Sequence, residues 1–331
     1  MMSAFSQPPT ILVLGGTGTV GSRVVKQLSA SPQQYRILVA SRNGAALDKK
    51  RNSSSSSEPA QQNQTSEIRH VLFDWHNRDT WSALFSSSSP VQEEAEGSSS
   101  NSPDQGHQIA AAFLVAPTSV DSGRLLSDLI DVARETGRVR RFVLLSASPL
   151  DKGGPAMGQA HAYLDDLGQR GEVEWTCLRP TWFQQNFVTQ AAHVKSIREE
   201  GKIYSATGDG KIPWVSADDI AAVAVRTLTD ERAHNTDYLI LGPELLSYGD
   251  IATILSDVLG RKIVHVDLTT AELKKRHQES GIPEEYAKML AAMDTPIRAG
   301  SENRTNDVIL RITGAAPTRF RDFADSVKDV W

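Results

Sequence analysis

The chain is poor in cysteine, with Cys177 as its one thiol in 331 residues. One thiol cannot form an internal disulfide, and its position inside the apolar run 173–178 indicates a buried strand residue rather than a nucleophile. The sequence also has no apolar run near the roughly 18 residues of a membrane span, and no charged-then-apolar leader. We therefore expect a cytoplasmic protein with no membrane partner.

Concentrated positive charge is missing as well. The formal net charge is −5, and no stretch gathers basic residues, which argues against nucleic acid as a partner. No two of the eight histidines have the spacing of metal ligands together with a third residue that could complete the site. No metal site is therefore predicted. The 39% of hydrophobic residues in a chain of this length suffice for a doubly wound sheet and a smaller lobe.

The most informative segment that is present is ILVLGGTGTVG, residues 11–21. Four apolar residues run into glycines spaced GxGxxG and GxxGxxG, and an amphipathic helical pattern follows. Glycine is needed where φ is positive or where a Cβ would block a pyrophosphate, and the helix N-terminus supplies free N–H groups. The segment predicts a dinucleotide site, with contacts from Gly15, Thr17, Gly18, Thr19, Val20 and Gly21.

The end of the next predicted strand, residues 35–40, indicates which dinucleotide binds. Ser41 and Arg42 stand where an NAD-specific enzyme would usually place an acid. A guanidinium there can grip a 2′-phosphate bidentately, so we predict NADP(H), with Ser41 and Arg42 among its contacts. Asp74, which follows the apolar run 71–73, is predicted to contact the adenine; capping of the next helix is the alternative.

Strand patterns alternate with helix patterns along the first half of the chain. This alternation predicts an α/β fold with a doubly wound parallel Rossmann sheet. Strands are predicted at 109–116, 141–146 and 173–178, with helices at 122–136 and 160–169. Pro117 and Ser146, at the ends of two of these strands, complete the predicted cofactor contacts. Two serine-rich stretches, 52–66 and 86–106, bury too little apolar surface to order themselves and are predicted to be disordered loops.

The second half has a looser pattern and more aromatic residues. We predict that residues 10–180 form the NADP-binding core and that 181–331 form mainly a smaller α+β substrate-binding lobe. Within that lobe, Ser216 to Asp219 resembles a capping box before a helix at 220–229. A late strand is predicted at 262–268, and mostly helix at 269–293.

A proton donor is hard to find. Short-chain dehydrogenases use a Tyr-x-x-x-Lys pair to protonate an alkoxide, but the tyrosine nearest that place, Tyr163, is followed four residues later by Leu167. His161 is the one nearby side chain with an ordinary pKa close to neutrality. His161 and Tyr163 are therefore the catalytic candidates, a structural role being the alternative for His161. Hydride delivery to an iminium carbon leaves no oxyanion and needs no such pair.

Several segments together resemble the NmrA-like, atypical short-chain dehydrogenases, and more closely the fungal festuclavine synthase and agroclavine dehydrogenase family of ergot alkaloid pathways. They are GGTGTVG, the Ser41-Arg42 strand end, FDWHNRDTW (73–81), LVAP (114–117), WTCLRPTWFQQNF (175–187) and the block 201–224. The resemblance implies NADPH-dependent reduction of a C=N bond in an indole-alkaloid intermediate of fungal secondary metabolism. The lysine that many NmrA-like reductases carry before the strand at 173–178 is replaced here, where the chain reads Gln159-Ala160-His161.

By the same resemblance, Trp182, Phe183 and Asn186 line the nicotinamide and substrate side, and Trp214 adds an aromatic wall. Ordinary core packing is the alternative for each aromatic residue. Two other functions stay open: a Pictet-Spengler-type cyclase that holds NADP(H) as a structural group, and a non-catalytic NADP sensor. The aromatic second half counts against the sensor, which needs a partner surface more than an aromatic cavity.

Overall fold

The fold is described here from a computed structural model, over residues 8–44, 66–85 and 108–331. The predicted loops 52–66 and 86–106 lie outside these residues, apart from Ser66. That serine is buried, and its Oγ accepts a hydrogen bond from the backbone N of Tyr35 over 3.2 Å. Ser66 is therefore held in place directly before the strand that begins at Glu67.

The chain divides into two compact units, Met1–Arg179 with Ala221–Tyr238, and Pro180–Ile220 with Leu239–Trp331. The predicted boundary at residue 180 lies beside this division, whereas residues 221–238 return to the first unit. The assignment of one unit to the nucleotide and the other to the substrate remains a prediction.

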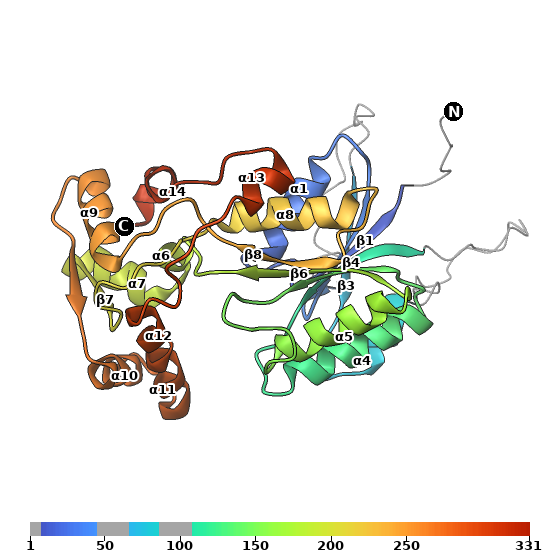
Figure 1. Ribbon diagram of the computed structural model, residues 1–331, viewed down its shortest axis with the longest axis horizontal. Helices are drawn as coiled ribbons and strands as arrows, with labels where there is room; N and C mark the ends of the chain where they lie inside the picture. Colours follow the sequence, from blue (N-terminus) through green and yellow to red (C-terminus); the bar gives the residue numbers. More distant parts are fainter. Residues whose placement is uncertain (1–7, 45–65, 86–107) are drawn as a thin grey trace, which may run out of the picture. The chain divides into compact units, whose positions relative to one another are not determined.

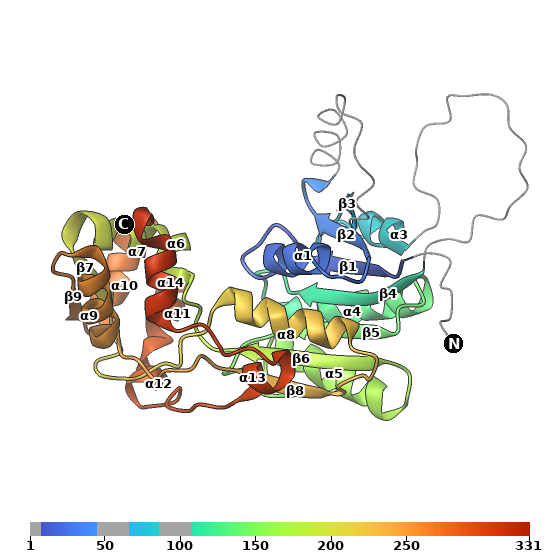
Figure 2. The same ribbon diagram turned by 90° about the horizontal axis from the view of Figure 1, so that it is seen from above.

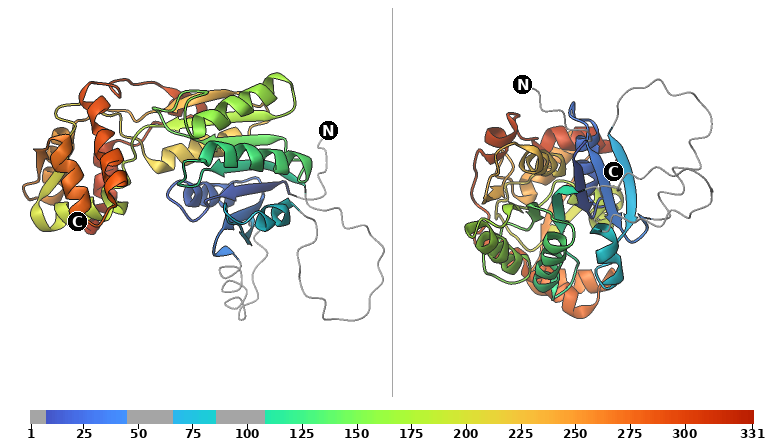
Figure 3. Two further views of the ribbon diagram at one scale, coloured as in Figure 1. Left: turned by 90° about the horizontal axis from the view of Figure 1, so that it is seen from below. Right: turned by 90° about the vertical axis from the view of Figure 1, so that its right-hand side faces the viewer.

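A seven-stranded sheet builds the first unit, in the order β3-β2-β1-β4-β5-β6-β8. The pairs from β3 through β6 are parallel, which confirms the predicted doubly wound α/β class. Figure 3 shows β1, β2 and β3 side by side at one edge, in blue to cyan. The strands are β1 Thr10–Leu14, β2 Arg36–Ser41, β3 Glu67–Leu72, β4 Ile109–Val115, β5 Arg141–Leu145, β6 Glu174–Pro180 and β8 Thr236–Ile240.

Helices cover both faces of this sheet (Figure 1). Helices α1 (Gly21–Ser29) and α8 (Ala217–Thr229) lie on one face, and α4 (Ser122–Glu135) and α5 (Met157–Gln169) on the other. Helix α3 (Asp79–Phe85) packs beside β3 and α4. Because both faces are covered, all five residues of β1 are buried, as expected for a continuous apolar run in a parallel sheet.

The second unit contains a two-stranded parallel sheet, β7 (Lys202–Ser205) and β9 (Val264–Asp267), with α9 (Tyr248–Leu259) beside it (Figure 2). The predicted helical stretch 269–293 is two helices, interrupted near Gly281, which has φ +86°. The remaining elements are α6 Asn186–Thr189, α7 Ala191–Lys195, a π-helix Ser196–Glu200, α10 Thr270–Glu279, α11 Glu284–Ala292, α12 Asp294–Arg298, α13 Val308–Thr313, α14 Phe320–Val327 and a 3₁₀ turn Lys328–Val330.

The predicted capping box at the start of α8 forms only in part. The Oγ of Ser216 accepts a hydrogen bond from the N of Asp218 over 3.2 Å. The carboxylate of Asp219 instead accepts from the N and Oγ1 of Thr318, over 2.8 and 3.1 Å. The helix also begins at Ala217 rather than at residue 220. Asp219 therefore joins two distant segments instead of capping its own helix.

Candidate cofactor and substrate site

The glycine loop between β1 and α1 has the shape that a dinucleotide requires. Gly15 has φ +61°, and its carbonyl oxygen accepts a hydrogen bond from the N of Gly18 over 2.8 Å, which closes the turn. A Cβ on Gly21 would lie 2.2 Å from that same oxygen, and a Cβ on Gly16 would lie 2.6 Å from the Cγ1 of Val39. Larger residues cannot enter these positions without moving backbone or core atoms, so the spacing seen in the sequence is enforced by packing.

The N-terminus of α1 fits an anion. Its first turn contains no acidic residue, and Val20 at the N-cap offers no side-chain acceptor. Thr17 and Gly18 are exposed and Thr19 is half-buried, whereas the side chain of Val20 is buried. The partial positive charge of this end, with no carboxylate in the first turn to offset it, therefore suits a pyrophosphate.

The turn after β2 presents Arg42 to solvent. The carbonyl oxygen of Ser41 accepts a hydrogen bond from the N of Phe73 over 3.0 Å, which ties the turn to the segment after β3. A Cβ on Gly44 would lie 2.0 Å from the carbonyl oxygen of Val71, so this backbone approaches β3 closely. Arg42 is exposed, and Ser41 is half-buried. The anchored turn leaves a guanidinium that suits a 2′-phosphate.

Asp74 occupies a local turn. One of its carboxylate oxygens accepts a hydrogen bond from the N of His76 over 2.9 Å, and its carbonyl oxygen accepts from the Nε1 of Trp81 over 3.0 Å. The structure therefore shows that Asp74 stabilises the turn before α3. This role is close to helix capping, the alternative to the adenine contact. The predicted contact with the adenine stays a prediction.

Pro117 and Ser146 lie at the carboxyl edge of the sheet, as expected from the ends of parallel strands. Pro117 follows β4, and its carbonyl oxygen accepts from the N of Ser119 over 2.9 Å. Ser146 is buried, and its N donates to the carbonyl oxygen of Leu178 over 2.8 Å. A Cβ on Gly15 would lie 3.3 Å from the Cβ of Val115, so the glycine loop reaches the end of β4. Parallel pairing thus brings residues from four strand ends to one edge, where open α/β sheets bind their ligands.

The two catalytic candidates, His161 and Tyr163, both lie on α5. His161 is 1% exposed on α5, with its ring centroid 5.4 Å from that of Trp175, and burial lowers its pKa. Tyr163 donates a hydrogen bond to the Oδ1 of Asp131 over 2.5 Å. Burial and this hydrogen bond raise the pKa of Tyr163 to about 12. Both placements favour structural roles, and the catalytic roles remain untested predictions.

Two further features of this unit concern β6. Cys177 lies fully buried in the strand, and burial raises the pKa of its thiol to about 12, which agrees with a core residue rather than a nucleophile.

The sequence did not reveal the partners of Arg179. Its guanidinium donates to Asp237 and to the carbonyl oxygen of Ser148, each over 3.0 Å, and also to Asp151. These bonds hold the loop after β5, at the same edge as Ser146.

In the second unit, two segments that carry the family resemblance lie side by side. Phe183 and Val215 form a parallel bridge, and the N of Val215 donates to the carbonyl oxygen of Trp182 over 3.0 Å. The buried side chain of Gln185 accepts from the N of Ala217 over 2.7 Å. Trp182, Phe183 and Asn186 are half-buried. Each of these three predicted substrate residues therefore keeps part of its surface open to solvent.

Trp214 is placed differently. Its side chain is 2% exposed, and its Nε1 donates to the carbonyl oxygen of Leu246 over 3.1 Å. Its ring packs at 5.0 Å from Phe187 and 5.2 Å from Tyr248, between centroids. This is the core alternative stated above, so we leave Trp214 out of the proposed substrate contacts.

Within the described ranges, no group of three or more His, Cys, Asp or Glu side chains is arranged to hold a metal ion. Across those same residues, no helix combines the length and apolarity that crossing a bilayer requires.

Comparison with known proteins decides the family. The model of the NmrA-like family matches residues 7–299. The chain belongs to the NmrA-like family. Festuclavine synthase II of Penicillium roqueforti is 41% identical, over 97% of this chain and 99% of its own length. Agroclavine dehydrogenase of Claviceps fusiformis is 40% identical, over 97% and 98%. The resemblance inferred from the motifs is confirmed, and the second of these relatives is named as a dehydrogenase.

Solved structures agree with the fold of this NmrA-like protein. The triphenylmethane reductase of Citrobacter sp., solved with NADP(H), has a TM-score of 0.71 at 20% identity, covering 97% of this chain and 100% of its own. The quinone oxidoreductase QOR2 of Escherichia coli, solved with NADPH, has a TM-score of 0.73 at 18% identity, covering 96% and 99%. At these identities the likeness shows the fold alone.

Proposed function

We propose that this NmrA-like protein is an NADPH-dependent reductase of a C=N bond in an indole-alkaloid intermediate. The observation that carries the proposal is its 41% identity to festuclavine synthase II over 97% of the chain, since the match spans the glycine loop and the segment around Trp182. Gly15, Gly18 and Arg42 would hold NADPH, which supplies a hydride when bound. The exposed Arg42 favours NADPH over NADH.

The chemistry of the C=N bond fits the surroundings of Tyr163. When a hydride adds to an iminium carbon, the π electrons move to nitrogen and leave a neutral amine, so no oxyanion has to be protonated. Tyr163 donates to Asp131, its pKa is raised to about 12, and Leu167 replaces the lysine of a relay pair. A carbonyl reductase would need a proton donor in this helix, whereas an iminium reductase does not.

The half-buried residues after β6 would contact the substrate. The open surfaces of Trp182 and Phe183 offer aromatic faces, which attract a cation by about 0.5–2 kcal/mol. The amide of Asn186, the first residue of α6, adds a polar group four residues after Trp182. An iminium on a flat indole combines a positive charge with an aromatic plane, and this residue set suits both.

The test is to supply the purified chain with NADPH and chanoclavine-I aldehyde, whose aldehyde can condense with its own amine. We expect nicotinamide oxidation and an amine that is the iminium cation plus one hydride, so its protonated form lies two mass units above that cation in the mass spectrum. A new ring formed without NADPH loss would favour the cyclase, and tight NADPH binding without turnover across a panel of indole iminium compounds would favour the sensor. NADH in place of NADPH serves as the matched control and should react more slowly.

A further inference from the structure

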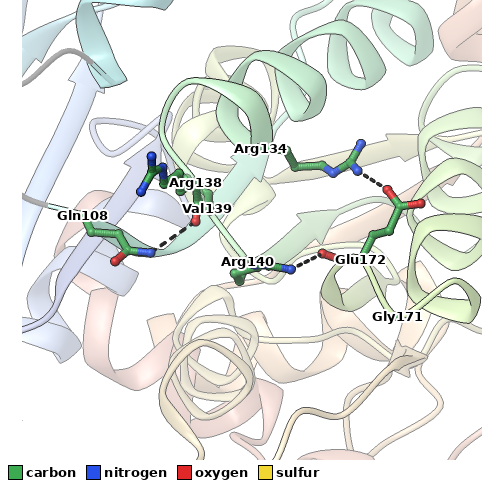
Figure 4. Close-up of a pocket in the computed structure, with 7 residues that line it drawn as sticks. All are labelled: Gln108, Arg134, Arg138, Val139, Arg140, Gly171 and Glu172. Carbon is green, nitrogen blue, oxygen red and sulfur yellow. Dashed lines mark hydrogen bonds and ion pairs between the residues drawn. The ribbon is translucent and has the colours of Figure 1, made fainter.

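The first unit contains a basic hollow of about 570 Å³, which Figure 4 shows in close-up. We define this basic hollow by Arg134, Arg138, Arg140, Gln108 and Glu172. Gln108 stands just before β4, Arg140 just before β5 and Glu172 just before β6. The basic hollow therefore lies at the amino ends of three neighbouring strands, at the edge opposite the glycine loop.

The charges of the basic hollow do not balance. Glu172 forms ion pairs with both Arg134 and Arg170, so its carboxylate is already engaged. Arg140 donates to the carbonyl oxygen of Glu172 over 3.3 Å and has no acidic partner within the described residues. The guanidinium of Arg138 has no partner there either. Two exposed guanidinium groups are thus left without a counter-charge from the described part of the chain.

The backbone around Arg138 is held in an unusual conformation. Arg138 has φ +50°, in the left-handed region that residues other than glycine rarely adopt. The next residue, Val139, is buried, and its N donates to the carbonyl oxygen of Ala133 over 3.0 Å. Val139 therefore fixes the chain between the two open arginines. Figure 4 shows Arg138 and Gln108 on one side of the basic hollow and Arg134, Arg140 and Glu172 on the other.

We propose that the basic hollow binds a small molecule that carries a diphosphate group. Guanidinium forks bind phosphoryl oxygens bidentately, and two unbalanced cations match the charge of such a group. Cations on both sides of a space of about 570 Å³ suit an anion longer than a single phosphate. The net charge of −5 disfavours an extended polyanion such as a nucleic acid. The site is separate from the glycine loop, so both can be filled together.

The test is a calorimetric titration of sodium pyrophosphate into the full chain with one equivalent of NADP+, enough to fill the glycine loop but without an excess whose own diphosphate could enter the basic hollow. We expect binding that weakens by about tenfold or more in the double variant Arg138→Asn with Arg140→Gln. Asn is chosen at 138 because it tolerates a positive φ. Arg226→Gln, at an exposed arginine of α8, is the matched control and should bind like the wild type.

ADP and sodium citrate complete the experiment. ADP binding more tightly than pyrophosphate supports a diphosphate ester as the ligand, and the reverse order supports free diphosphate. Arg140→Lys keeps the charge but loses the fork, so it should bind with intermediate affinity and checks the proposal if the double variant fails to fold. The proposal is overturned if wild type shows no binding, if citrate binds equally well, or if every arginine variant that folds binds like wild type.

Discussion

The hydroxyl of Tyr163 donates a hydrogen bond to the Oδ1 of Asp131 over 2.5 Å, from α5 to α4. In Tyr163→Phe, that bond is lost but no proton donor is removed from the proposed reaction. We expect turnover of the iminium within about threefold of wild type and a loss of about 1 kcal/mol in the free energy of unfolding. Steady-state kinetics and urea denaturation measure the two quantities. A large fall in kcat at unchanged stability would show that Tyr163 acts in the chemistry.

The contact between Gly21 and the carbonyl oxygen of Gly15 predicts a graded effect on NADPH binding. In Gly21→Ala the new Cβ would lie 2.2 Å from that oxygen, whereas in Gly18→Ala it would lie at 3.2 Å. We expect no measurable NADPH binding for Gly21→Ala and a weakening of about tenfold for Gly18→Ala, by fluorescence titration. Gly249→Ala, whose Cβ would meet nothing closer than 3.5 Å, is the control. Wild-type affinity in Gly21→Ala would show that the loop does not hold the nucleotide.

Arg42 is expected to set the preference for NADPH. Loss of a guanidinium on a phosphate removes a charge-assisted hydrogen bond worth roughly 1.5–3 kcal/mol. Arg42→Gln should therefore raise the KM for NADPH by about tenfold or more and leave the KM for NADH nearly unchanged. Arg321→Gln, at an exposed arginine of α14, is the control and should change neither value. Equal effects on both nucleotides would mean that Arg42 does not meet the 2′-phosphate.

Burial of His161 predicts a dependence of stability on pH. Burial holds the pKa of His161 below its ordinary value of 6.5 in the folded chain, while the unfolded chain titrates at that ordinary value. Its contribution is therefore complete above pH 6.5 and is lost as the pH falls towards the lower, folded pKa. We expect His161→Leu to lose less stability than wild type between about pH 7 and about pH 5 in urea titrations. His76→Gln, at an exposed histidine, should follow the wild type, and a parallel curve for His161→Leu would contradict the argument.

The side chain of Gln185 satisfies the buried N–H of Ala217 over 2.7 Å. Gln185→Met keeps the volume but leaves that donor unpaired, so we expect a loss of about 1–3 kcal/mol in the free energy of unfolding. Gln190→Met, at an exposed glutamine close by, should cost little. Urea denaturation followed by tryptophan fluorescence makes the comparison. Equal stability of the two variants would show that the bond contributes nothing.

Local patterns predicted the first unit well. Short windows of sequence determine the glycine loop, the strand ends at Ser41 and Ser146, and the helices between them. Hydrophobic periodicity and turn-forming residues were therefore enough to predict these elements. Cys177 was placed in a buried strand for the same reason, and it lies there. The edge that gathers these strand ends followed from parallel pairing alone.

Contacts between residues far apart in the sequence limited the other predictions. The capping box at Ser216 looked complete from four residues, but Asp219 bonds to Thr318, 99 residues away. Trp214 looked like an aromatic wall until its bond to Leu246 and its packing placed it in the core. Tyr163 likewise has its partner 32 residues away. No short window contains these contacts, and tertiary packing decides them.

The most direct test of the account follows the hydride itself. NADPH that carries deuterium at the transferable position of the nicotinamide is mixed with the protein and the iminium formed from chanoclavine-I aldehyde, and the product is examined by mass spectrometry and NMR. The account predicts one deuterium, bound to the carbon next to the amine nitrogen, in step with NADPH oxidation. An unlabelled product, or a cyclised product formed while the labelled NADPH stays intact, would contradict it.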